Sequence, residues 1–92
     1  MIHEIKETVT LSNKLGLHAR AAALFVKTAS KFKSDITVSK NNNNVSGRII
    51  TGLIMLTAVK GSSLDIKVVG EDAKECFNEL FNLINGKFGE EK

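Results

Sequence analysis

The sequence contains one cysteine, no tryptophan and no tyrosine among its 92 residues. Because a single cysteine cannot form an intramolecular disulfide, and the chain has only two histidines, we expect neither a disulfide scaffold nor a bound metal or cofactor. Cys76 is expected to be a small buried apolar side chain. The net charge is +3, but the lysines are scattered and no tryptophan or tyrosine can stack on bases, so we expect no nucleic-acid partner.

Long apolar runs are also missing. No stretch approaches the roughly 20 residues that a membrane-spanning helix needs. The first residues, MIHEIKETVTL, interleave acidic and apolar side chains, which is unlike a signal peptide. With 42% hydrophobic and 25% charged residues, residues 1–92 fit one ordinary globular domain. We therefore expect a cytoplasmic protein without direct membrane insertion.

Apolar and polar residues alternate in three segments, residues 3–11, 35–40 and 63–69, which predicts half-buried strands. A further short strand is predicted near Val45 and Ser46. The four asparagines at 41–44 lie between two of these strands, and asparagine is a common turn residue. We therefore interpret residues 35–46 as a hairpin with a loop at 41–44.

Residues 19–32 change to a helical period, with Ala22, Phe25, Val26 and Ala29 on one apolar stripe. Residues 48–57, RIITGLIMLT, are apolar almost all round. We favour a short helix here, with Ile49, Leu53 and Leu56 buried and Ile50 and Ile54 pointing elsewhere.

A last helix is predicted to begin at Asp72, which with Glu75 forms a capping box, and to end at Asn85–Gly86. The tail after Gly86 is expected to fray, with Phe88 as the exception. The element order is then βαββαβα. It predicts an α+β fold in which helices cover one face of a four-stranded, largely antiparallel sheet.

His18 lies where a glycine-containing loop becomes the first helix, within SNKLGLHARAA. Helix N-terminal amides lack intrahelical partners, and the helix dipole adds positive potential, so this point suits a phosphate. A neutral imidazole is a nucleophile, and Arg20 can bind phosphate oxygens in a fork. The pattern predicts a histidine that accepts and donates a phosphoryl group, with first-turn amides and Arg20 stabilising the product.

One alternative accompanies this interpretation of His18. His18 could simply cap the helix, as many terminal polar residues do. The chain has neither a Gly-rich phosphate loop nor an aspartate cluster for magnesium, so we expect a carrier on which other enzymes act rather than an enzyme. His3 starts a strand without a neighbouring arginine at i+2, and we expect it to have no role.

The segments LGLHARAAALFVKTASKF, RIITGLIML and AVKGSSLDI resemble the HPr family, the histidine-containing phosphocarriers of the bacterial phosphotransferase system. The resemblance covers essentially the whole chain. It implies an open-faced β-sandwich with four antiparallel strands and three helices. It also implies that enzyme I, charged by phosphoenolpyruvate, phosphorylates Nδ1 of His18. His18 would then pass the group to an A-type component of a sugar permease.

The resemblance also implies site residues. Arg20 matches the family's active-site arginine, and the amides of Ala19 and Arg20 would bind the phosphate. The docking face would combine the first two helices, and the family's monomeric state would carry over. The expected partner-binding residues are Leu17, Leu24, Lys27, Ile50, Thr51 and Ile54.

The chain departs from the family pattern at two positions. Ala21 stands where proline is frequent, which affects only local rigidity. Ile49 stands where many Gram-positive members have a regulatory serine, so phosphorylation there is excluded; Ser46 is interpreted as a turn residue. Two alternatives to sugar transport stay open: the nitrogen-related regulatory branch of the family, and an interaction module without carrier turnover.

Overall fold

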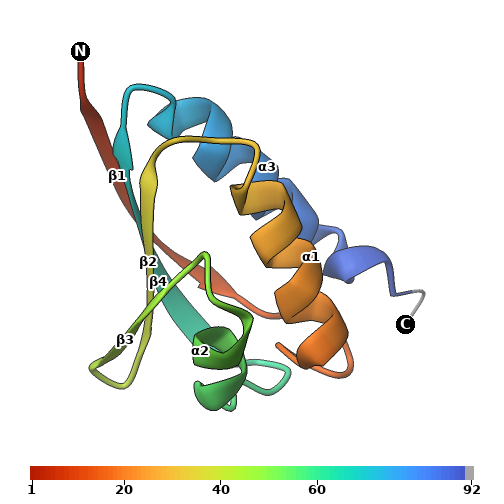
Figure 1. The fold of residues 1–92 in the computed structure, drawn as a ribbon. Coiled ribbons are helices and arrows are strands. Elements are labelled where there is room, and N and C mark those ends of the chain that lie inside the picture. Colours follow the sequence, from red (N-terminus) through yellow and green to blue (C-terminus); the bar gives the residue numbers. More distant parts are fainter. Residues whose placement is uncertain (91–92) are drawn as a thin grey trace.

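A computed structural model describes residues 1–90. Its elements follow the predicted order βαββαβα and add a final turn of 3-10 helix. Figure 1 labels them. Their bounds are β1 His3–Thr10, α1 Ala19–Ala29, β2 Asp35–Lys40, β3 Asn43–Ser46, α2 Ile50–Met55, β4 Ser63–Gly70, α3 Ala73–Asn85 and the 3-10 turn η1 Lys87–Gly89.

The four strands form one antiparallel sheet in the order β1-β4-β2-β3. Alternate side chains enter the core, and those between them face solvent, as the period of two requires. The helices α1 and α3 lie on one side of the sheet, and α2 packs beside α1 (Figure 1). The α+β, open-faced architecture is confirmed.

The core lies between the sheet and the helices. Phe25, Leu53, Leu64, Ile66 and Leu80 are among its largest fully buried side chains. Cys76 is buried, as expected, and burial raises the pKa of its thiol to about 11. At that pKa the thiol stays protonated and behaves as an apolar group.

The hairpin loop is shorter than predicted. Only Asn41 and Asn42 form the turn, with φ of 51° and 67°, while Asn43 and Asn44 belong to β3. Two left-handed residues twist a hairpin in the sense that its strands prefer, and asparagine tolerates that conformation. Composition alone could not show which two of four identical residues would turn.

The prediction of a short helix within residues 48–57 is confirmed, but one of the three residues expected to be buried is exposed. Leu53 and Leu56 are buried, whereas Ile49 is 54% exposed. Ile49 precedes the helix in an extended conformation, so the helical spacing that placed it with Leu53 does not apply to it. The first helix also ends earlier than expected, at Ala29.

Arg48 holds the segment that follows α1. Its guanidinium donates hydrogen bonds to the carbonyl oxygens of Ala29 at 2.9 Å, and of Phe32 and Ser34 at 2.6 Å each. The carbonyl of Ala29 lies in the last turn of α1, where carbonyls lack intrahelical donors, and it also accepts a hydrogen bond of 3.1 Å from the amide of Phe32. Arg48 therefore acts as a side-chain cap for α1 from a distant part of the chain.

The predicted capping box at α3 is wrong. Asp72 occupies the N-cap position but makes no side-chain cap hydrogen bond. Its carboxylate instead accepts hydrogen bonds from the amides of Lys33 and Ser34 and from the Ser34 hydroxyl. These hydrogen bonds lower the pKa of Asp72, and the bond from the Ser34 hydroxyl has the largest effect. Asp72 and Arg48 thus hold the same connection, residues 30–34, from two sides.

Two kinds of feature are absent from the part of the chain that the structure describes. Within residues 1–90, no helix has the length and apolar character to cross a membrane. In the same range, no group of three or more His, Cys, Asp or Glu side chains is arranged to hold a metal ion.

Candidate functional site

Gly16 sets the course of the loop that leads to His18. Its φ is +66°, a conformation that favours glycine. A Cβ at this position would lie 2.3 Å from the carbonyl oxygen of Ala58. That same oxygen accepts a hydrogen bond of 2.8 Å from the amide of Leu17. The glycine therefore allows the close backbone approach that fixes the residue immediately before His18.

His18 is the N-cap residue of α1, with an extended backbone (φ −82°, ψ 179°). Its carbonyl accepts the hydrogen bond of 2.8 Å from Ala22 that begins the helical series. The amides of Ala19 and Arg20 precede that bond and are free to bind an anion. No acidic residue stands in the first turn to occupy them. The helix start predicted from the sequence is confirmed.

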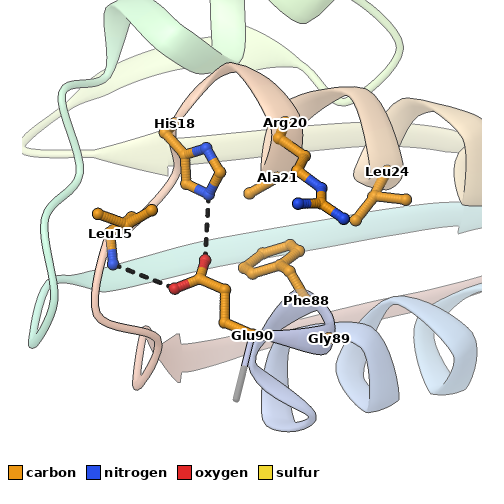
Figure 2. A pocket seen from close by; sticks show the side chains of 8 residues that line it. All are labelled: Leu15, His18, Arg20, Ala21, Leu24, Phe88, Gly89 and Glu90. Atoms are coloured by element: carbon orange, nitrogen blue, oxygen red, sulfur yellow. Dashed lines mark hydrogen bonds and ion pairs between the residues drawn. The ribbon is translucent and has the colours of Figure 1, made fainter. Parts of the chain in front are cut away.

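The alternative that His18 serves only as a cap is wrong, because its side chain makes no cap hydrogen bond. The imidazole instead turns toward the end of the chain, where Nε2 lies 3.0 Å from Oε2 of Glu90. Figure 2 shows this contact and places the other ring nitrogen on the side away from Glu90. The His18 side chain is 28% exposed, so a partner can reach it.

Glu90 is held by two further donors. The side-chain amide of Asn13 donates to Oε2 at 2.7 Å, and the backbone amide of Leu15 donates to Oε1 at 3.3 Å. The hydrogen bond from Asn13, followed by that from His18, lowers the pKa of Glu90. Asn13 is fully buried and also donates to the carbonyl of Gly16, so the carboxylate is tied to the loop that carries His18.

The prediction that the tail frays is therefore wrong for residues 87–90; residues 91 and 92 lie outside the described residues. Phe88 is buried, as the sequence suggested, and its burial brings Glu90 to the site. No periodicity links Glu90 to His18, since 72 positions separate them. The available signal was the apolar Phe88 near the end of a polar tail.

An open pocket of about 260 Å³ adjoins His18. Arg20 is exposed and lines this pocket with His18, which fits the expected use of both on one ligand. In Figure 2 the Arg20 side chain extends along α1 toward Leu24. The lining residues are Leu15, His18, Arg20, Ala21, Leu24, Phe88, Gly89 and Glu90.

The expected docking residues are mostly accessible. Ile50 is 39% exposed, Ile54 is 37% exposed, and Lys27 and Thr51 are also exposed, while Leu24 is half-buried. Leu17 is the exception: it is 4% exposed and belongs to the core, so its place in the docking face was wrong. Its backbone amide donates a hydrogen bond to the carbonyl of Ala58, and its side chain packs in the core. Sequence reasoning also missed Met55, which is 78% exposed on α2.

Comparison with known proteins supplies the family. A sequence profile described as the PTS HPr component phosphorylation site matches residues 5–86. The chain belongs to the HPr family. It is 48% identical to the phosphocarrier protein HPr of Neisseria meningitidis serogroup A over 86 residues, which cover 94% of this chain and 97% of that protein. As an HPr-family member it is a phosphocarrier of the phosphotransferase system and not an enzyme.

Two further proteins are similar to this chain over nearly their full length, one in structure and one in sequence. The crystal structure of HPr-C-His from Thermoanaerobacter tengcongensis superimposes with a TM-score of 0.91 at 44% identity, covering 96% of this chain and 99% of that one. The phosphocarrier protein NPr of Shewanella violacea is 34% identical over 87 residues, 95% of this chain and 96% of its own. HPr and NPr are thus both full-length relatives of this chain.

Proposed function

We propose that His18 accepts a phosphoryl group on Nδ1 from phosphorylated enzyme I and passes it to an A-type component of a sugar permease. The observation that carries the proposal is the position of the imidazole. It is partly exposed at the N-terminus of α1, in one pocket with Arg20. HPr-family membership over nearly the full chain supports it.

The surroundings of His18 suit the product of this step. Phosphorylation adds a dianionic group beside the first turn of α1, where the amides of Ala19 and Arg20 and the positive end of the helix dipole favour negative charge. The Arg20 guanidinium can bind two phosphate oxygens in a fork. These groups stabilise charge, while the partner proteins supply the rest of each active site.

A surface for these partners lies on the two neighbouring helices. We define the α1–α2 patch as Leu24, Lys27, Ile50, Thr51 and Ile54. The helices α1 and α2 pack together, and Leu24 also lines the pocket beside His18. A partly exposed apolar centre with polar side chains at its edge is typical of a transient protein interface. We propose that enzyme I and the acceptor use this patch in turn.

The decisive experiment measures intact mass after incubation with phosphoenolpyruvate, magnesium and enzyme I. The native chain should gain one phosphoryl group that is lost in mild acid and stable in base. The variant His18→Ala should gain none. The matched control is His3→Ala, which removes the other histidine and should be labelled like the native chain. Equal labelling of His18→Ala and native protein would refute the assignment.

A second candidate is the nitrogen-related regulatory branch, favoured by the full-length similarity to NPr. The two branches differ in the acceptor rather than in the carrier chemistry. Phosphorylated protein should therefore be offered separately to an A-type sugar component and to an A-type component of the nitrogen branch. Faster transfer to the second would assign the regulatory branch.

Regulation through a serine at the start of α2 is not part of the proposal, because Ile49 has no hydroxyl. The nearby Ser46 accepts a hydrogen bond from the amide of Arg48 through its Oγ, which fits a turn residue. The monomeric state, the cytoplasmic location and the absence of a nucleic-acid partner stay predictions. An interaction module without turnover would bind through the α1–α2 patch yet fail the labelling experiment.

A further inference from the structure

The contact between Glu90 and His18 assigns a role to a residue beyond the segment that matches the family profile, residues 5–86. A carboxylate accepts hydrogen bonds and donates none. Oε2 of Glu90 receives the amide hydrogen of Asn13 at 2.7 Å and faces Nε2 of His18 at 3.0 Å. The ring nitrogen that faces Glu90 therefore carries a hydrogen, and in the neutral imidazole the lone pair is then on Nδ1.

The backbone before Glu90 is held in an unfavourable conformation. Lys87, Phe88 and Gly89 have φ of 58°, 53° and 80°. For the two non-glycine residues a left-handed conformation costs about 1–2 kcal/mol each. The segment keeps it because Phe88 is buried in the core and the Glu90 carboxylate has three donors. Glu90 is thus delivered to His18 by a strained turn rather than by a free tail.

We propose that Glu90 is a positioning residue that keeps a proton on Nε2 of His18 throughout the phosphoryl cycle. This inference rests on the proposed role of Nδ1 as the acceptor. Glu90 touches the ring but not the nitrogen that reacts.

In the forward step, the Nδ1 lone pair forms a bond to phosphorus. The bond between phosphorus and the phosphorylated side chain of enzyme I breaks, and its electron pair stays on that side chain. Because Nε2 keeps its hydrogen, the product ring is a phosphorylated imidazolium with one positive charge. The carboxylate 3.0 Å away stabilises that charge as it develops.

In the reverse direction, a nucleophilic side chain of the acceptor protein forms a bond to phosphorus, and the electron pair of the Nδ1–phosphorus bond returns to Nδ1. With Nε2 protonated, the group that leaves is a neutral imidazole. If Nε2 had lost its proton, an imidazolate anion would have to leave, which is a much poorer leaving group. Glu90 therefore favours both transfers for the same reason. The charged side chains that line this pocket are Glu90, the residue after η1, and Arg20, from α1.

The test compares native protein with Glu90→Gln and Glu90→Ala. The matched control is Glu79→Gln, which removes a carboxylate that pairs with Lys31 at 3.1 Å elsewhere on the surface. Nitrogen-15 NMR of the unphosphorylated chains reports which ring nitrogen carries the hydrogen. We expect the hydrogen almost entirely on Nε2 in native protein and Glu79→Gln, and a mixture of both tautomers in the Glu90 variants.

Phosphorus-31 NMR then follows the pH midpoint at which the phosphorylated ring loses its Nε2 proton. Loss of a partly exposed opposite charge at this distance should lower the midpoint by about one pH unit. At a pH above the midpoints of both native and variant protein, the fraction of phosphorylated rings that carry the Nε2 proton should be about tenfold lower in the Glu90 variants than in native protein. The transfer rate should fall by the same factor. A merely structural role for Glu90 would change neither the tautomer nor this midpoint.

Unchanged tautomers and an unchanged midpoint in both Glu90 variants would overturn the proposal. If native protein were not phosphorylated on His18, the proposed function would fail instead. The tautomer measurement on unphosphorylated chains would still decide whether Glu90 fixes the hydrogen on Nε2. Failure of the two proposals is therefore distinguishable.

Discussion

Arg48 offers a strong test of how this fold is held together. It is half-buried, and its three hydrogen bonds all end on backbone carbonyls between Ala29 and Ser34. The variant Arg48→Met keeps an unbranched apolar stem but removes every donor. The carbonyls of Phe32 and Ser34 would then lose this donor, while the carbonyl of Ala29 would keep only its hydrogen bond from the amide of Phe32.

The expected loss follows from the hydrogen bonds. A bond to a charged group contributes about 1.5–3 kcal/mol. Three bonds at the lower end of that range, with some replacement by water at this half-buried site, give a loss of about 4 kcal/mol. A domain of this size has about 5–14 kcal/mol of stability in total, so the loss is a large part of it. It should lower Tm by about 15 °C or more.

Urea unfolding followed by circular dichroism measures this loss. Arg48→Lys keeps the charge but not the planar fork, and should fall between native and Arg48→Met. The control is Arg20→Met, which removes the only other arginine, an exposed one, and should change stability by less than about 0.5 kcal/mol. A loss below about 1 kcal/mol in Arg48→Met would refute the view that these bonds hold the connection.

Three further predictions concern other parts of the molecule. The pKa of Asp72 is lowered in the folded chain, so its carboxylate stabilises the fold above the pKa of the unfolded chain and loses this contribution as the pH falls through the folded value. Acid titration of stability should therefore be less steep below about pH 4 in Asp72→Asn than in native protein. Gly16→Ala should destabilise by about 2 kcal/mol or more, and by more than Gly61→Ala, in urea unfolding. Both glycines have positive φ, but only at Gly16 would the new Cβ meet backbone atoms. Ile54→Asp should raise KM for the protein as a substrate of enzyme I about tenfold without loss of Tm, whereas Ile2→Asp, exposed on the N-terminal segment, should leave KM unchanged.

Much of the fold can be predicted from patterns among residues that are close in the sequence. Alternation with a period of two defined β1, β2 and β4, because successive side chains of a strand must enter opposite environments. The apolar stripe of α1 and the polar loop before it placed His18 at a helix start, since amphipathic periods and helix boundaries depend on neighbouring residues. The pairing of His18 with Arg20 in one pocket followed from the same local spacing.

Polar side chains with distant partners could not be placed in this way. Asp72 has the sequence pattern of an N-cap residue, yet its carboxylate binds Ser34 in the connection of residues 30–34. Tertiary packing brings donors to the carboxylate there, and it makes no side-chain hydrogen bond to the first turn of α3. No local pattern indicates a partner for Arg48, although its guanidinium binds the carbonyl at the end of α1. Ile49 was expected to be buried but is exposed, because it precedes the helix and helical spacing does not apply to it. Leu17 was expected in the docking face but is buried in the core.

The sequence by itself determined the order of the elements, the helix that presents His18, and the residue types able to carry a phosphoryl group. These depend on periodicity and on chemistry within a few residues. Only the tertiary structure decided which nitrogen of His18 faces a carboxylate, because that depends on Glu90, 72 positions away, and on the buried Phe88 that brings the end of the chain to α1. A hydrogen bond between distant segments is specified by the packing of the whole core, and no local pattern encodes it.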